Sequence, residues 1–172
     1  MDGGVEFKDF SIEVKAELDE TTIAWMHEVA NEIAAQAQRT TSTEGWTSEE
    51  RTQLRDNYRA DVDEGKGQAM IGTPLEQGYW EEWGTGEYAA HGDGRKGWWV
   101  YIEGQASQGG GKSYSTREEA EEAASFLRRV KGLDAVVTNG RRPNYTLERS
   151  FETKQGWARD RLADMLKERM DK

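Results

Sequence analysis

The chain has 172 residues, no cysteine, two histidines and a formal net charge of −10, from 23 Lys and Arg against 33 Asp and Glu. The length suits one domain with a sizeable core, and the lack of cysteine excludes disulfides and thiolate metal sites. The acidic balance disfavours gripping nucleic acid or an anionic membrane, because both need clustered Lys and Arg. No apolar run is long enough to span a bilayer, and the start MDGGVEFKDF lacks the features of a secretory signal.

The negative charge is concentrated in one part of the chain. Residues 1–64 hold 16 acidic and 6 basic residues, whereas residues 65–172 hold 17 of each. We therefore predict an acidic helical segment over 1–64, facing water, a lumen or one basic partner, and a neutral remainder.

The acidic segment carries two helix patterns. A stripe at helical spacing predicts a helix that starts near residue 12 or 20 and ends near 39. A second, mostly exposed helix is predicted over 47–64, where Thr47 and Glu50 have the spacing of a capping box. The stripe of the first helix consists of Ile23, Met26, Ala30, Ile33, Ala34 and Ala37.

The middle of the chain is rich in strands and glycine. Residues 68–75 and 79–83 each have the pattern of a short strand, and 84–97 is a long glycine-rich loop. The run WWVYIE over 98–103 predicts a strand, and 104–112 predicts a flexible connection.

A capped helix follows. Residues 115–130 show a buried stripe of Ala, Leu and Val, with Ser115 and Glu118 spaced as a capping box and Gly132 placed as a left-handed C-cap. Residues 134–138 predict a strand.

The interval 98–138 therefore has the order strand–helix–strand, which favours a right-handed crossover. Pro143 precedes a last helix over 144–172, in which Gly156 weakens the helix or allows a bend.

These elements predict an α+β fold: N-terminal helices, a small mixed β-sheet with a glycine-rich loop, an inserted strand–helix–strand unit and a long C-terminal helix. We expect one domain over 1–172. Its parts are the acidic helical segment 1–64, a sheet region over 65–143 with the inserted helix at about 115–131, and the C-terminal helix 144–172.

The residues point to no catalytic, cofactor or metal site. His91, Asp93 and Glu87 could bind a cation, but acids in glycine loops are common. A small hydrolase that uses the glycine loop is a second alternative, and loss of activity on mutating His91 or Asp93 would support it. The adjacent Glu81 and Glu82 carry no signal for acid–base chemistry, since paired carboxylates recur along the chain. We expect no enzyme activity and no cofactor.

Three segments stand in order along the chain: YWEEWGTGEYA over 79–89, GDGRKGWWVY over 92–101 and TNGRRPNYTL over 138–147. Together they resemble a known family, the neck or tail-completion proteins of long-tailed double-stranded-DNA bacteriophages. The resemblance extends over about residues 65–170, and the inserted 105–136 element departs from it. That element also resembles half of a peptidoglycan-binding repeat. An alternative function is therefore a cell-wall or protein binding module built on 98–138.

The resemblance implies a structural virion protein at the neck, in head–tail joining or tail completion, assembled as a ring of copies. Its partners would be head connector or head-closure proteins and tail-terminator or tail-tube proteins, with genomic DNA passing nearby and no membrane. The protein would be in host cytoplasm during assembly.

Aromatic and basic residues, together with Thr85 of the Gly-Thr-Gly motif, are the candidate contacts with neighbouring copies or partners, because Trp, Tyr and Arg are favoured at interfaces. Packing of the rings within the domain is the competing explanation, and the glycines of Gly84-Thr85-Gly86 are expected to serve positive φ or close approach. The candidates are Trp80, Trp83, Thr85, Tyr88, Arg95, Lys96, Trp98, Trp99, Arg141 and Arg142.

Overall fold

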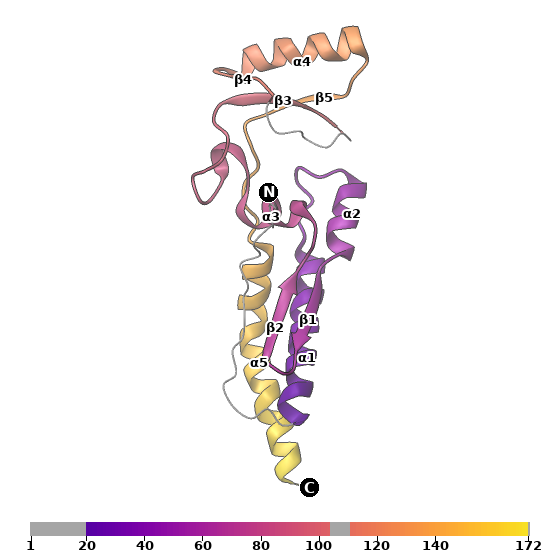
Figure 1. The fold of residues 1–172 in the computed structure, drawn as a ribbon, viewed down its shortest axis with the longest axis vertical. Helices are drawn as coiled ribbons and strands as arrows, with labels where there is room; N and C mark the ends of the chain where they lie inside the picture. Colours follow the sequence, from indigo (N-terminus) through magenta and orange to yellow (C-terminus); the bar gives the residue numbers. More distant parts are fainter. Residues whose placement is uncertain (1–19, 104–110, 172) are drawn as a thin grey trace. The chain divides into compact units, whose positions relative to one another are not determined.

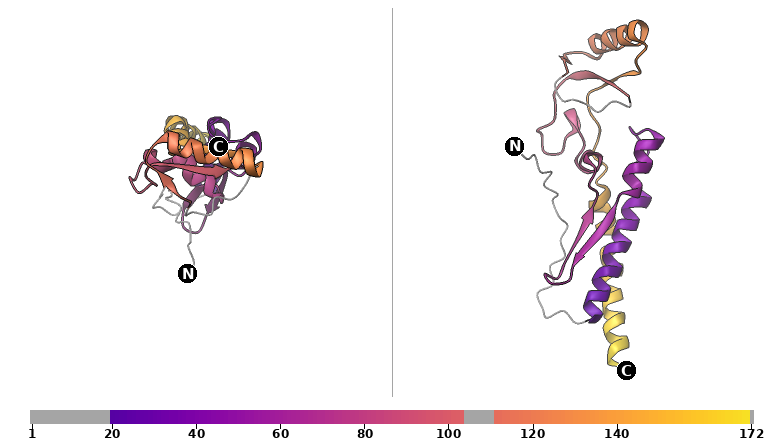
Figure 2. Two further views of the ribbon diagram at one scale, coloured as in Figure 1. Left: turned by 90° about the horizontal axis from the view of Figure 1, so that it is seen from above. Right: turned by 45° about the vertical axis from the view of Figure 1, so that its right-hand side comes forward.

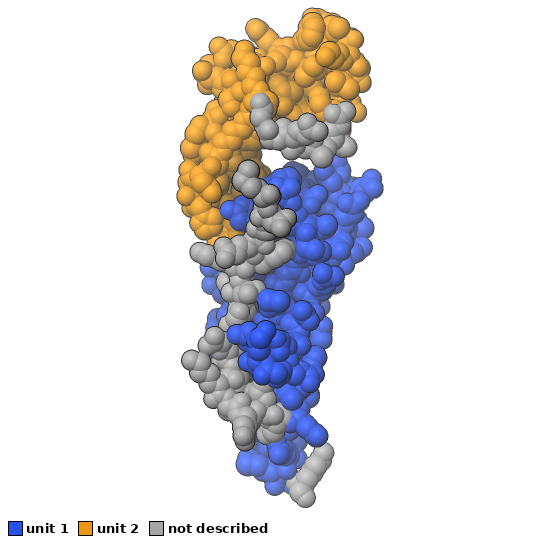
Figure 3. All heavy atoms as spheres, viewed as in Figure 1, with its two compact units in different colours: residues 1–82, 144–172 blue, residues 83–143 orange. Residues whose placement is uncertain are grey.

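The computed structural model describes residues 20–103 and 111–171, and these form two compact units (Figures 1 and 3). Unit 1 comprises residues up to 82 and from 144 onward, and unit 2 comprises 83–143. The fold is α+β, as predicted. The prediction of a single domain over 1–172 stays a prediction.

Two long helices and a hairpin build unit 1. Helix α1 (Glu20–Thr40) lies beside α5 (Thr146–Met170), and the antiparallel hairpin β1 (Arg59–Asp63) and β2 (Gln68–Gly72) packs on α1 (Figures 1 and 2). The indole Nε1 of Trp25 donates a buried hydrogen bond of 2.6 Å to the carbonyl of Ala158, which ties the two helices together. The core contains Trp25, Met26, Val29, Ala30, Ile33, Ala34, Ala69, Ile71 and Ala158.

The predicted stripe on α1 is confirmed in five of its six positions, because Met26, Ala30, Ile33, Ala34 and Ala37 are buried, and Ile23 at its start is half-buried. Helix α5 continues through Gly156 without interruption. The local sequence is enough to predict that both segments are helical, since their apolar residues repeat at helical spacing along the chain.

The second acidic helix is shorter than predicted. Helix α2 (Ser48–Asp56) has the expected Thr47–Glu50 capping box, but it ends at Asp56 and the chain continues as β1. In β1, Ala60 and Val62 alternate with exposed charged residues and pack against the core. Pairing with β2 buries these two residues, so the tertiary contact overrides a spacing that also suited a helix.

The predicted strand over 79–83 is wrong. These residues end a helix, α3 (Glu76–Trp83), whose Gly78 faces Thr73 too closely to carry a side chain. The helical turn places the adjacent carboxylates of Glu81 and Glu82 in the interior of unit 1, where both are buried.

Unit 2 is a three-stranded antiparallel sheet in the order β4-β3-β5, covered on one face by α4 (Figure 1). Its elements are the short 3-10 helix η1 (Gly86–Tyr88), β3 (Trp98–Ile102), β4 (Ser113–Tyr114), α4 (Arg117–Lys131) and β5 (Ala135–Thr138).

The expected mixed sheet and right-handed crossover are both wrong. Strands β3 and β5 pair antiparallel, with Val100 opposite Val137, and the described strands form two antiparallel sheets. Strand β4 reverses the chain after β3, and α4 then carries the chain back so that β5 also runs antiparallel to β3. The expected flexible connection lies largely at 104–110, outside the described residues.

The cap of α4 lies one residue later than predicted. Thr116 and Glu119, rather than Ser115 and Glu118, form the capping box. Gly132 closes the helix in the left-handed conformation at φ 62°, as predicted.

Candidate assembly surface

Glu81 is the centre of a buried hydrogen-bond cluster in unit 1. Its carboxylate accepts from the backbone N–H of Ser42 at 2.7 Å and from the indole of Trp46 at 2.9 Å. It also accepts from the side chains of Asn144 and Thr146, each at 2.9 Å. One fully buried carboxylate therefore joins the loop after α1 to the segment that starts α5.

Glu82 caps α5 from a distant part of the chain. Tyr145, the residue at the N-cap position, provides no side-chain cap. The Glu82 carboxylate instead accepts from the backbone N–H groups of Leu147 at 2.8 Å and Glu148 at 3.1 Å. Burial raises the pKa of the Glu82 carboxyl, and the two backbone hydrogen bonds oppose that shift.

Backbone hydrogen bonds close unit 2 at its two ends. Thr85 N–H donates to the Arg141 carbonyl at 2.9 Å, and Arg141 N–H donates back to the Thr85 carbonyl and side-chain hydroxyl at 3.2 and 3.0 Å. Glu87 N–H donates to the Asn139 carbonyl at 2.9 Å. The Gly84-Thr85-Gly86 motif thus holds the segment that enters unit 2 against the segment that leaves it.

The close approach explains the glycines. Gly86 has φ 61°, and a Cβ there would lie 2.5 Å from the Trp99 ring and closer still to the Asn139 carbonyl. The expectation that these glycines serve positive φ and close approach is confirmed.

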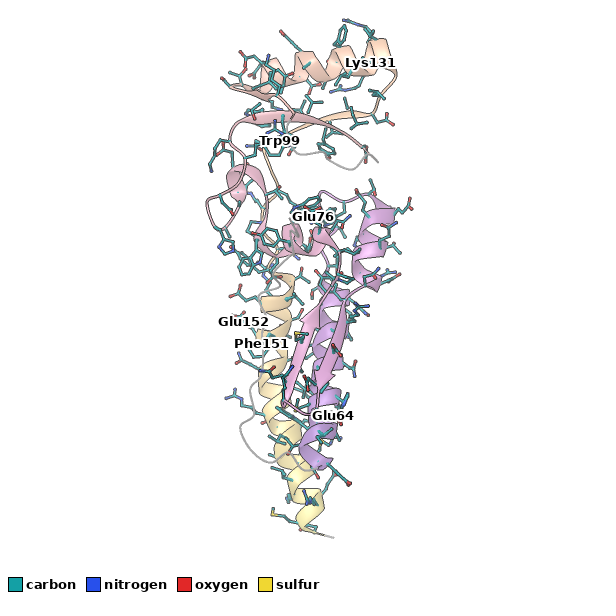
Figure 4. The ribbon with its side chains drawn as sticks, viewed as in Figure 1. Glu64, Glu76, Trp99, Lys131, Phe151 and Glu152 are labelled. Atoms are coloured by element: carbon teal, nitrogen blue, oxygen red, sulfur yellow. The ribbon has the colours of Figure 1, made fainter. Side chains whose placement is uncertain are left out.

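Cations lie over aromatic rings across unit 2. Arg95 lies 4.9 Å from the centroid of Trp99, and its Nε donates to the Ser113 hydroxyl at 2.8 Å. Arg142 lies 4.8 Å from the Tyr88 ring. Trp99 is labelled on β3 in Figure 4.

The structure thus gives several of the predicted contact residues a packing partner within their own unit. Trp80 stacks on Trp46 at 6.4 Å in unit 1, Trp83 lies against His91 at 4.7 Å, and Lys96 reaches Glu87 at 3.8 Å. The role of these side chains in contacts with a neighbouring copy or a partner stays a prediction.

The predicted contact residue Trp98 lies under Arg117 and belongs to a second group of side chains, whose other members Lys112, Tyr114 and Arg117 were not among the predicted contacts. Lys112 lies 4.8 Å from the Tyr114 ring, and Arg117 lies 5.7 Å from the Trp98 ring. Lys112 and Tyr114 are two positions apart at the start of β4, but the pairing of Tyr114 with Trp98 depends on sheet register, which the local sequence does not give.

Two of the candidate cation ligands, Glu87 and His91, have different partners within unit 2. Glu87 accepts from Gly97 N–H at 2.8 Å, and His91 packs on Trp83. Across residues 20–103 and 111–171, no three His, Cys, Asp or Glu side chains are arranged to hold a metal ion. Within the same ranges, no helix combines the length and apolarity that crossing a bilayer requires.

Residues 6–103, more than half of the chain, match the model of the family described as "Bacteriophage HK97-gp10, putative tail-component". No curated protein and no solved structure matches the chain. The match includes α1, the β1–β2 hairpin, α3 and β3, and it contains the segments 79–89 and 92–101 that resembled a phage family.

The chain therefore belongs to a class of structural, virion-associated proteins of the phage tail or neck. It belongs to the HK97-gp10-like family. The third resembling segment, 138–147, lies outside the matched residues, so its assignment to the family pattern stays a prediction.

Proposed function

We propose that the protein acts at the phage neck, in head–tail joining or tail completion, as a ring of identical copies with no catalytic activity. The observation that carries this proposal is the match to a phage tail-component family over residues 6–103, which includes parts of both units. In this proposal the ring stands between head connector or head-closure proteins and tail-terminator or tail-tube proteins.

The use of the buried carboxylates supports a structural role. Glu81 and Glu82 are occupied by hydrogen-bond donors from the chain itself, and they hold the start of α5 in place. A catalytic carboxylate needs access to a substrate, whereas these two stabilise the fold of unit 1.

The charge supports a passage that does not bind DNA. Residues 1–64 carry a net −10, and an acidic surface repels phosphate, so DNA could pass nearby without being held. Whether residues 1–64 line the passage is tested by cryo-EM of the assembled neck, and their location on the outside would contradict this part of the proposal.

The main test is a phage in which the gene is deleted. We expect filled heads and separate tails that fail to join, with infectivity restored when the protein is supplied from a plasmid. Mass spectrometry of purified wild-type virions should detect the protein. Its absence from virions, or normal joined particles from the deletion phage, would overturn the proposal.

A further inference from the structure

Two aromatic rings and two cations lie together at the β3–β4 pairing and the start of α4, and neither cation has an anionic partner among the described residues. Trp98 and Tyr114 are opposite each other in the β3–β4 pairing. Arg117 lies over the first ring and Lys112 over the second, and both cations are exposed. We call Lys112, Tyr114, Trp98 and Arg117 the cation–ring cluster.

The cations of the cluster differ from two other basic residues of unit 2, which have acidic partners. Arg128 is paired with Glu121 at 2.6 Å, and Lys96 is near Glu87. Neither Lys112 nor Arg117 makes a hydrogen bond or an ion pair with any described residue, so their N–H groups remain available. Stacking on a ring restricts a long side chain before binding, which lowers the entropy lost when an anion binds.

The net charges of the two units indicate which surface of another copy could supply the anion that the cluster cations lack. The described residues of unit 1 hold 19 acidic and 11 basic residues, a net −8, whereas those of unit 2 hold 8 acidic and 9 basic residues, a net +1. A contact of unit 1 with unit 1 in another copy would oppose like charges. A contact of unit 2 with unit 1 brings the available cations to an excess of carboxylates.

Unit 1 offers suitable carboxylates on its surface. Glu44, Asp61 and Glu76 are exposed, and none of them forms an ion pair with a described residue. DNA is a weaker candidate for the same cluster, because tight phosphate binding needs many clustered cations and this chain is acidic as a whole.

We propose that the cation–ring cluster binds carboxylates on unit 1 of a second copy of this chain. The inference rests on the proposed ring and specifies its contact. It makes the contact heterologous, since a surface of unit 2 meets a different surface of unit 1, and a heterologous contact can close into a ring.

The first test measures self-association of the full chain by analytical ultracentrifugation at low and at physiological salt. Arg117→Gln and Lys112→Gln should each weaken association about tenfold, the effect of losing one charge-assisted hydrogen bond. Added salt should weaken the wild type more than either variant. Arg129→Gln and Lys131→Gln are matched controls on α4, and they should leave association unchanged.

The second test locates the partner. Wild-type protein labelled with ¹⁵N is mixed with unlabelled protein and treated with a carbodiimide, which joins amines to carboxylates in contact. We expect mixed-isotope cross-links from Lys112 to carboxylates of unit 1. Cross-links confined to one copy, or equal weakening by the matched controls, would overturn the inference, as would a wild type that stays monomeric.

A third test measures binding of double-stranded DNA to the wild type and the variants. Double-stranded DNA that binds the wild type at physiological salt, and is lost in Arg117→Gln but not Arg129→Gln, would overturn the inference in favour of phosphate binding. Failure of the contact is distinguishable from failure of the proposed function, because the deletion phage and virion mass spectrometry report on the neck role whatever surface the copies use.

Discussion

The carboxylate of Glu81 accepts a hydrogen bond of 2.9 Å from the hydroxyl of Thr146, and both side chains are fully buried. This contact joins α3 to the first turn of α5 across 65 positions of sequence. The same carboxylate also receives the indole of Trp46, so one acidic group organises three segments of unit 1.

Glu81→Ala is expected to lower the free energy of unfolding of unit 1 by about 3 kcal/mol or more, because it leaves several buried donors without an acceptor. Urea denaturation followed by tryptophan fluorescence measures the change. Glu152→Ala, at an exposed position of α5, is the control and should change stability by no more than about 0.5 kcal/mol. Equal effects of the two variants would contradict the role of Glu81.

Glu82 should make stability fall as pH rises. Burial raises the pKa of its carboxyl in the folded state, so in the window above the ordinary value of 4.5 the folded chain holds more protons than the unfolded chain. Its contribution to stability is therefore greatest below that window and is lost as pH rises through the folded pKa. Subtracting the stability curve of Glu82→Gln from that of the wild type, at several pH values, should reveal this slope.

Glu32 should act in the opposite direction. Hydrogen bonds from Lys154 and Arg39 lower the pKa of its carboxyl, so its contribution is present above the ordinary value of 4.5 and is lost as pH falls through the folded pKa. Glu32→Gln should remove that acid-side loss. A Glu32 difference curve with the same sign as the Glu82 curve would contradict the assignment.

Gly86→Ala should disrupt unit 2, because the added Cβ meets the Asn139 carbonyl and the Trp99 ring. Gly92 also has positive φ, at 74°, but a Cβ there meets nothing within 4 Å, so Gly92→Ala isolates the backbone strain at about 1 kcal/mol. We expect Gly86→Ala to cost clearly more than Gly92→Ala. Hydrogen exchange should show lost protection in β3 and β5 for Gly86→Ala, with α1 still protected.

Gly156→Ala should stabilise the protein by about 1 kcal/mol. The glycine lies inside α5, and a Cβ there meets nothing within 4 Å, so alanine gains helix propensity without a clash. Urea denaturation measures the gain. A loss of stability would indicate that α5 needs the glycine in the folded chain.

Local signals in the sequence were enough to predict several elements. The stripe of α1 repeats at helical spacing, the Thr47–Glu50 capping box is formed within three residues, and Gly132 ends α4 in the left-handed conformation. The resemblance of 79–89 to a phage family agrees with the family match. Each of these features depends on neighbouring residues, so a pattern along the chain is sufficient.

The tertiary structure decided the features that depend on distant residues. Nothing near Glu81 and Glu82 in the sequence distinguishes them from the many surface acids, and only the approach of α5 makes them buried acceptors. The change from helix to β1 and the antiparallel pairing of β3 with β5 likewise require partners elsewhere in the chain. By itself the sequence determined helices α1, α4 and α5, the capping box that starts α2 and an acidic first third. Long-range hydrogen bonds and strand pairing decided which acids are buried and that residues 79–83 are helical.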